Sequence, residues 1–381
     1  MKHFTLFFFV GVYAMACNKK NSDSPAPPKD TIATLSRTTI FVPGKDTLYA
    51  IDADSAIIRW TVAIGSSTGF APNYNNGVLI VGRNSLSAFN AKTGKLLWDF
   101  RTYTEMSVPA IAYGMVYCSD NYQNFYGIDL KTGTQKWIYS SNTRNTLLQN
   151  CSSPTVKDST VYIGDGRNLC LYAFDAITGK IKWKNSDAGN VISGPCLVNG
   201  IIYSNSDRAL TAINAATGIT KWAIDYSWGY LSPTVANGKL YAGRMLGVIS
   251  AFDTATGKEL WSYPAADATV GIGQIYSSPI VSAGLVYIAT SDATPGSAIH
   301  AVDAETGLLK WKYPGSFGYW KSPVVYNGKV YIGDGNKLTV LDAVSGTVVW
   351  KLALGTSIAN SVCIVDTNNK VYLPGDAGDV Q

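Results

Sequence analysis

Short stretches that alternate apolar and polar positions recur along this chain, and each precedes the same kind of turn. The clearest copy is residues 249–261, ISAFDTATGKELW. Its first five residues alternate as a half-buried strand does. Asp253 and Gly257 then mark a tight turn, because an Asp side chain accepts hydrogen bonds from nearby backbone N–H groups and glycine adopts positive φ. A second strand that ends on Trp261 is predicted after the turn.

Seven further copies of this unit begin at residues 48, 86, 125, 171, 210, 299 and 338. Each copy closes on a tryptophan: Trp60, Trp98, Trp137, Trp183, Trp222, Trp261, Trp311 and Trp350. These tryptophans recur about every forty residues, which indicates an array of one supersecondary unit. Seven copies have glycine in the turn, namely Gly94, Gly133, Gly179, Gly218, Gly257, Gly307 and Gly346, and the first copy has Ala56 there.

Two more strand patterns lie between each tryptophan and the next copy, joined in several periods by a pair such as Asn237-Gly238, a strong hairpin signal. Each period therefore predicts four antiparallel strands, named A to D in chain order. Radial stacking buries the faces of such sheets. We predict an all-β fold, an eight-bladed β-propeller of four-stranded antiparallel blades, with a seven-bladed ring as the alternative.

The two ends of the predicted propeller meet in its first blade. The chain enters with a strand B near residue 38, and residues 361–366 predict the missing inner strand A, which closes the ring. Residues 370–380 resemble another strand B and the start of a strand C. This segment either overlays the first blade or begins a unit that stops.

The chain begins with a predicted export signal. Residues 1–16 combine a basic start, an apolar core and small residues, and are too short for a membrane span. The box before Cys17 resembles a bacterial lipoprotein cleavage site, so we expect Cys17 to be lipidated, with plain secretion as the alternative. Residues 17–33 then form a polar, proline-rich tether, and residues 34–381 form the propeller. The expected location is the cell envelope, lipid-anchored at the outer membrane on its periplasmic or surface side.

Composition excludes several kinds of site. The net charge of +5 is too small to favour nucleic acid as a partner. The only histidines are His3, in the predicted leader, and His300, so a multi-histidine metal site cannot form and a Ser–His–Asp triad would have to use His300. We interpret His300 as an ordinary strand residue. The remaining cysteines, Cys118, Cys151, Cys170, Cys196 and Cys363, follow no disulfide spacing and are expected to be buried thiols.

The repeated motif, [Leu/Ile]-x-Ala-[Ile/Phe/Val]-[Asp/Asn]-x-x-[Thr/Ser]-Gly-x-x-x-Trp, resembles that of the pyrroloquinoline-quinone (PQQ) type propellers over about residues 38–381. The resemblance implies that the motif glycines and tryptophans lock neighbouring blades together. One branch of the family, the quinoprotein dehydrogenases, adds a vicinal disulfide and a Ca²⁺ site, and this chain has no adjacent cysteines. The other branch is the propeller lipoprotein of the outer-membrane β-barrel assembly machinery, which is similar in length, leader and blade number.

One face of the predicted ring combines aromatic and basic loop residues. Connections from strand D to the next strand A, and from B to C, emerge together on this face. The predicted binding rim comprises Tyr226, Trp228, Tyr230, Phe317, Tyr319, Trp320, Arg83, Arg167, Arg208, Arg244 and Lys337. Aromatic residues and arginine are common anchors of protein interfaces, and they also suit a sugar or an anionic small ligand.

The sequence thus favours a non-catalytic, monomeric propeller that binds a protein partner in the cell envelope, as a scaffold in outer-membrane protein assembly. We assign no catalytic residue and no metal ligand, and we expect no cofactor. A PQQ- and Ca²⁺-dependent dehydrogenase is one alternative, and a surface lipoprotein that binds carbohydrate or a small ligand is the other.

Overall fold

The computed structural model describes residues 35–65, 70–82, 85–102, 106–120, 124–140, 152–166, 169–191, 193–225, 231–244, 247–265, 274–275, 277–291, 297–317 and 321–374. All of them belong to one compact unit, residues 32–381. Within these ranges the regular structure is β-strand throughout. The described ranges include no helix that is long and apolar enough to cross a membrane.

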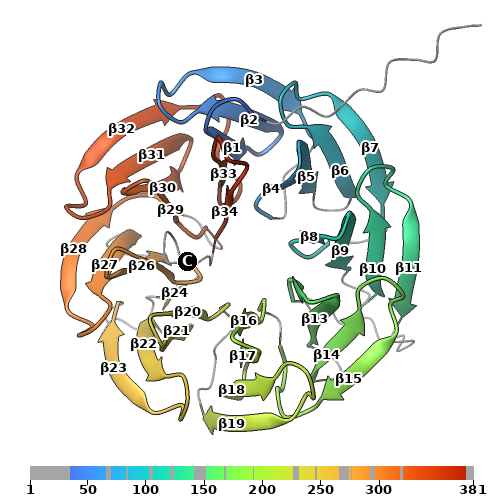
Figure 1. The fold of residues 1–381 in the computed structure, drawn as a ribbon. Coiled ribbons are helices and arrows are strands. Elements are labelled where there is room, and N and C mark those ends of the chain that lie inside the picture. The colour runs from blue at the N-terminus through green and yellow to red at the C-terminus, as the bar shows by residue number, and fades with distance from the viewer. Residues whose placement is uncertain are drawn as a thin grey trace, which may run out of the picture. The chain divides into compact units, whose positions relative to one another are not determined.

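Eight antiparallel sheets surround a common axis, so the fold is an eight-bladed β-propeller and the seven-bladed alternative is wrong (Figure 1). In each blade, strand A lies nearest the axis and strand D lies at the perimeter (Figure 1). Blades 2 to 4 comprise β4 (Asn73–Asn75), β5 (Val78–Gly82), β6 (Ser85–Asn90) and β7 (Leu96–Arg101); β8 (Ala110–Ala112), β9 (Met115–Ser119), β10 (Asn124–Asp129) and β11 (Gln135–Ser140); and β12 (Thr155–Lys157), β13 (Thr160–Asp165), β14 (Cys170–Asp175) and β15 (Ile181–Asn185).

Blades 5 to 8 repeat the same order, and blade 7 has one additional short strand, β24 (Gln274–Ile275), which pairs with β26. Their strands are β16 (Cys196–Val198), β17 (Ile201–Asn205), β18 (Ala209–Asn214) and β19 (Thr220–Asp225); β20 (Thr234–Ala236), β21 (Lys239–Arg244), β22 (Val248–Asp253) and β23 (Glu259–Pro264); β25 (Ile280–Ser282), β26 (Leu285–Ser291), β27 (Ala298–Asp303) and β28 (Leu309–Pro314); and β29 (Val324–Tyr326), β30 (Lys329–Asp334), β31 (Lys337–Asp342) and β32 (Val348–Ala353).

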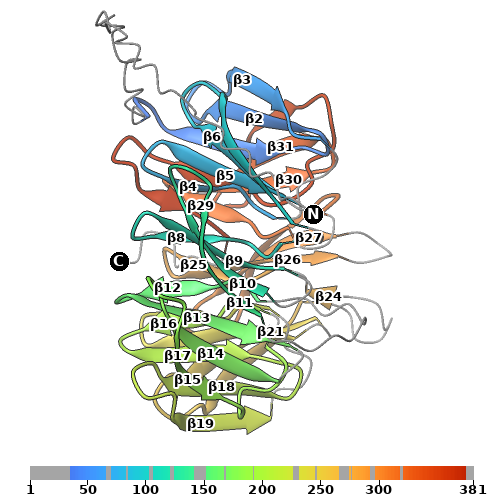
Figure 2. The ribbon, with the colours of Figure 1, turned by 90° about the vertical axis from the view of Figure 1, so that its right-hand side faces the viewer.

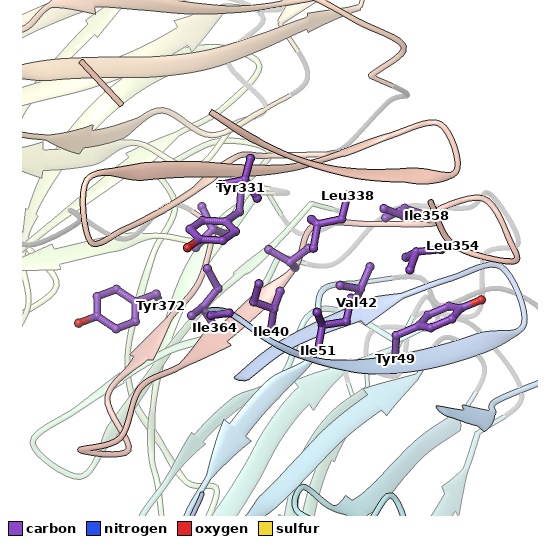
Figure 3. Close-up of a cluster of buried hydrophobic side chains, with 14 residues drawn as sticks. Ile40, Val42, Tyr49, Ile51, Tyr331, Leu338, Leu354, Ile358, Ile364 and Tyr372 are labelled. Carbon is purple, nitrogen blue, oxygen red and sulfur yellow. The ribbon is translucent and has the colours of Figure 1, made fainter. Parts of the chain in front are cut away.

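Blade 1 combines segments from both ends of the described chain. Its strands B to D are β1 (Thr39–Pro43), β2 (Thr47–Asp52) and β3 (Ile58–Ala63), and its strand A is β33 (Cys363–Val365). β33 pairs with β1 so that Ile364 lies opposite Ile40. Both side chains are fully buried in a cluster that also includes Tyr331 and Leu338 of blade 8 (Figure 3). The predicted closure of the ring by residues 361–366 is confirmed.

A fifth strand of blade 1 accounts for part of the segment whose pattern resembled a new strand B. β34 (Val371–Tyr372) pairs with β33 on the axial side of blade 1. It links blades 8 and 2, because the Tyr372 ring packs edge-on against Tyr326 at 4.8 Å and Tyr74 Oη donates to Asn369 Oδ1 at 2.7 Å. The segment therefore overlays blade 1, and residues 375–380 lie outside the described residues.

The antiparallel order of the strands gives the ring two faces that differ in their connections. The A–B and C–D turns lie on one face, here called the turn face, and include Asn237-Gly238 and residues 253–257. The B–C connections and the passages from strand D to the next blade lie on the other, here called the loop face. Figure 2 shows the ring from the side, with the strands crossing between these two faces.

The closing tryptophan of one blade docks on the C–D turn of the next. Trp137 Nε1 donates to the Ala176 carbonyl oxygen at 3.0 Å. Its ring covers Gly179, whose φ is +68° and where a Cβ atom would lie 2.6 Å from the indole. The same pair of contacts recurs for Trp60, Trp98, Trp183, Trp222, Trp261 and Trp311. Glycine is required here both for its positive φ and for the close approach of the ring.

The seam between blades 8 and 1 differs because Ala56 replaces the turn glycine. Ala56 still adopts positive φ, at 56°. In blades 3 to 7 the tryptophan ring lies 5.8–6.0 Å from a strand-B tyrosine at interplanar angles of 36–50°. Trp350 instead meets Tyr331 at 6.4 Å and 74°. The change in ring orientation coincides with the added methyl group, and β33 provides backbone pairing at this point of the ring.

A second contact joins neighbouring blades nearer the loop face. The residue two positions after the tryptophan packs on the third residue of strand C in the next blade, as Phe100 does on Tyr126 at 5.7 Å. At the seam between blades 6 and 7 this contact is a hydrogen bond of 3.0 Å between Tyr263 Oη and His300 Nδ1. His300 is 1 % exposed, and burial, with Lys312 nearby, lowers its pKa to about 4.

Substitution of two turn glycines separates the cost of the indole contact from the cost of positive φ. Gly179→Ala places a methyl group against Trp137, whereas Gly200→Ala has the same positive φ but nothing within 4 Å of the new Cβ. We expect Gly200→Ala to lower the free energy of unfolding by about 1 kcal/mol and Gly179→Ala by about 2–4 kcal/mol. Urea unfolding measures both. Equal losses would show that the indole contact adds nothing.

The buried His300 makes stability depend on pH in a predictable direction. The unfolded chain takes up a proton as the pH falls through the ordinary value of 6.5, but the folded chain does so only near 4. The free energy of unfolding therefore falls across this window, by about 2 kcal/mol at pH 4.5 for this one group. His300→Gln should lose less stability than the original chain between pH 7 and pH 4.5. Parallel pH dependences in urea unfolding would contradict this assignment.

Candidate functional site

The predicted binding rim belongs to the loop face, and four of its residues are described. Arg208 follows β17 in blade 5, Arg244 ends β21 in blade 6 and Lys337 begins β31 in blade 8. All three therefore lie at B–C connections, where the topology places them on the loop face. The rest of the rim, Tyr226, Trp228, Tyr230, Tyr319, Trp320, Arg83 and Arg167, lies outside the described residues.

Phe317 lies beneath the rim, not on its surface. Its ring is 2 % exposed and packs near Tyr313 with the centroids 6.4 Å apart, within the core shared by blades 7 and 8. The Phe317 carbonyl oxygen accepts a hydrogen bond from Ser297 Oγ at 3.1 Å. These contacts hold Phe317 in the core, so its ring is not part of an exposed surface.

A buried lysine at the start of blade 8 was missed by the sequence analysis. Lys321 is 8 % exposed, and burial lowers its pKa while Asp334 acts in the opposite direction. Blades 3, 4, 5 and 7 have serine at the equivalent position, as Ser277 in blade 7, which bonds strand B of its own blade. The sequence does contain a signal for this residue, because the other blades have an uncharged residue at the position of Lys321.

Lys321 belongs to a group of charges at the loop-face end of blade 8. Asp334 Oδ1 accepts the Ser316 N–H at 2.7 Å, which ties the carboxylate to the chain leaving blade 7. Lys351 lies with Nζ 5.4 Å from the centre of the Tyr313 ring, and a hydrogen bond with Tyr313 raises its pKa. Asp334 interacts electrostatically with both Lys321 and Lys351, and Lys337 lies opposite Asp334 in the pairing of β30 with β31. Such a group can bind a carboxylate or another anion of a partner.

Two observations concern the residue types most often used in catalysis and metal binding. His300 is sealed between Tyr263 and Thr290, so it cannot activate a nucleophile for a substrate at the surface. Within the described part of the chain, no group of three His, Cys, Asp or Glu side chains could hold a metal ion.

The cysteines do not fit the quinone site of the dehydrogenase branch, which uses a vicinal disulfide. Cys118, Cys170, Cys196 and Cys363 lie on four different blades, so none is adjacent to another in the chain, and Cys151 lies outside the described residues. The described residues thus provide neither that disulfide nor a Ca²⁺ site beside it.

Two cavities lie between neighbouring blades. One, of about 470 Å³, lies between blades 5 and 6 on the turn face and is lined by residues that include Tyr203, Lys221 and Asn237. The other, of about 730 Å³, lies between blades 1 and 2, where Val62 and Ser87 occupy the positions of the second inter-blade contact. Both side chains are small. At the seam between blades 2 and 3, Phe100 and Tyr126 fill the equivalent space, which stays open here.

The chain matches a family model described as outer membrane protein assembly factor BamB, over residues 19–106, 44–170, 151–228 and 225–376. Tetrathionate hydrolase of Acidithiobacillus ferrooxidans is 28 % identical over 67 % of this chain and 54 % of its own length. BamB of Yersinia pestis is 25 % identical over 64 % of this chain and 65 % of its own length. Quinohemoprotein alcohol dehydrogenase of Comamonas testosteroni is 37 % identical over a shorter region, 31 % of this chain and 19 % of that enzyme.

The fold is shared with solved structures. The crystal structure of BamB from Moraxella catarrhalis superposes with a TM-score of 0.65 at 20 % identity and covers 83 % of this chain and 91 % of its own. The match to the family model extends across all eight repeats and most of the chain. The protein therefore belongs to the PQQ-like repeat family whose model is described as outer membrane protein assembly factor BamB.

Proposed function

We propose that this chain is a non-catalytic, exported propeller lipoprotein that acts as a protein-binding scaffold in outer-membrane protein assembly. The observation that carries the proposal is the match of the repeat array, residues 19–376, to the BamB family model. The partner is a protein of the cell envelope, and the propeller itself is a monomer.

The loop face is the proposed contact surface for that partner. Arg208, Arg244 and Lys337 provide basic groups at its B–C connections, and the aromatic residues of the predicted rim belong by sequence to D–A connections, which the topology directs to the same face. Aromatic and basic side chains on a rigid support are favoured at protein interfaces, since little conformational entropy is lost on binding. The buried Lys321, with Asp334 near enough to act on its pKa, adds a fixed charge to this surface.

Lipid attachment at Cys17 is the proposed means by which the scaffold stays at the outer membrane. Diacylglycerol and an acyl chain on one residue provide enough buried methylene groups for stable anchoring. The polar residues 18–33 then give the propeller freedom to reach its partner.

Binding of a small anion is the second candidate function. It is favoured by the buried Lys321 and by the similarity to a tetrathionate hydrolase, although the match spans about half of that enzyme. A calorimetric titration with tetrathionate separates this candidate from a scaffold. The dehydrogenase alternative requires PQQ and Ca²⁺, and an absorbance titration of the purified chain with both tests it.

Removal of the aromatic rim should abolish partner capture without unfolding the ring. The triple variant Trp228→Ala, Tyr230→Ala and Trp320→Ala is expected to retain less than about a tenth of the envelope proteins captured by the immobilised original chain, because aromatic anchors dominate interface energies. Mass spectrometry of the eluates identifies and quantifies the captured outer-membrane assembly proteins. Thermal unfolding should be nearly unchanged.

Tyr113→Ala is the matched control, since Tyr113 is 52 % exposed but lies on the turn face. It should capture the partner as well as the original chain does. If the triple variant captures as much partner as the original chain, the loop face is not the contact surface.

Replacement of the predicted lipid-bearing residue should release the protein from the membrane. Cys17→Ser is expected to move more than about nine-tenths of the exported protein from the outer-membrane fraction to the soluble envelope fraction, because no acyl chain is then attached. Metabolic labelling with palmitate should mark the original chain and leave the variant unlabelled. An unlabelled original chain would show that Cys17 is not lipidated.

A further inference from the structure

The turn face exposes apolar side chains at its perimeter. Among the described residues, the large apolar side chains with the highest exposure belong, with the exception of Ile138, to turn-face turns or to the first residues of the strands that leave them. Five of them lie at the tips of C–D turns in blades 1, 4, 5, 7 and 8. They are Ile57, Ile177, Ile219, Leu308 and Val344, which are 61 %, 59 %, 67 %, 66 % and 70 % exposed.

Folding of the turns does not require these aliphatic residues. In the turn of blade 7, Asp303 Oδ1 accepts the backbone N–H groups of Glu305 and Thr306, and Gly307 provides positive φ. Leu308 contributes only backbone groups to the hydrogen bonds of this turn, and it is among the most exposed apolar residues. Blades 2 and 6 build the same turn with Lys95 and Lys258 after the glycine. A polar residue at the tip is therefore compatible with the fold.

The positions of the tips suit a flat partner. The C–D turns join the two outermost strands of each blade, so they form the outer circle of the turn face (Figure 1). The five aliphatic tips belong to blades on both sides of the axis. A globular protein docked on one sector of the ring would contact two or three adjacent blades. A planar surface can contact all five tips at once.

The charged residues between the tips indicate which kind of planar surface the turn face can bind. Exposed Lys92 and Lys95 in blade 2, Lys131 in blade 3, Lys180 in blade 4 and Lys258 in blade 6 lie on the same circle of turns. The turn aspartates are already engaged: Asp303, for example, caps its own turn and pairs with Lys310 at 3.1 Å. Lysines interleaved with exposed aliphatic residues are the composition of surfaces that bind anionic lipid interfaces.

We propose that the turn face lies against a lipid bilayer that presents anionic headgroups, with the aliphatic tips inserted among the headgroups and the lysines paired with them. This contact is independent of the loop-face partner and of acylation at Cys17. When the turn face lies flat against the bilayer, the loop face points away from it, because the two faces lie at opposite ends of the same strands.

The test uses the full chain with Cys17→Ala, so that no acyl chain contributes, and sucrose-loaded vesicles of phosphatidylglycerol and phosphatidylcholine. The chain should sediment with these vesicles, less so at high salt and less with phosphatidylcholine alone. The triple variant Ile177→Asn, Ile219→Asn and Leu308→Asn should partition at least about tenfold more weakly. Thermal unfolding of the variant should match that of the parent chain.

A pair of single substitutions gives a matched control. Val344→Asn removes a tip, whereas Ile138→Asn removes an exposed aliphatic side chain from the middle of β11, away from the turn face. Only Val344→Asn should weaken sedimentation. Failure of the parent chain to sediment, or equal sedimentation of parent and triple variant, would overturn the proposal. Loss of envelope-protein capture by the triple variant, with vesicle binding unchanged, would instead identify a protein interface and would also overturn it.

Discussion

The contact between an indole ring and a turn glycine is the constraint on which the rest of this propeller depends. Each blade alone is a meander with two exposed faces, and the tryptophan at its outer edge closes the gap to the next blade. The ring can approach so closely because the turn residue has no Cβ atom, and the same residue adopts the positive φ that ends the turn. One position therefore satisfies a backbone and a packing requirement together.

The last seam shows how the ring tolerates a departure from this rule. Ala56 occupies the glycine position of blade 1, and the Trp350 and Tyr331 rings meet at a steeper angle than the equivalent pairs of blades 3 to 7. At the same place, β33 and β34 add backbone pairing and a buried cluster that joins the two ends of the propeller (Figure 3). These pairings lie within blade 1, and the buried cluster joins this blade to blade 8.

Contacts between neighbouring blades hold the propeller together, so the residues on its two faces can vary without loss of the fold. The loop face has charged groups around Asp334, and the turn face has exposed aliphatic tips between lysines. Relatives with the same repeat include an assembly factor, a hydrolase and a dehydrogenase by name. A shared ring with different surface chemistry is consistent with the rule that function resides in sites added to a fold. For this chain the surface residues, and not the blade-docking motif, distinguish between the candidate functions.

The sequence by itself determined the class of fold, the number of blades and the strand that closes the ring. These follow from local signals, since Asn-Gly hairpins, capped turns and closing tryptophans each act over a few residues and repeat at a regular interval. The tertiary structure decided what depends on neighbours in space: β34 became a fifth strand, Phe317 was buried beneath the rim, and Lys321 was placed near Asp334. An alternating pattern does not specify the partner of a strand, and a residue type does not specify its burial, because both depend on which segments the closed ring brings together.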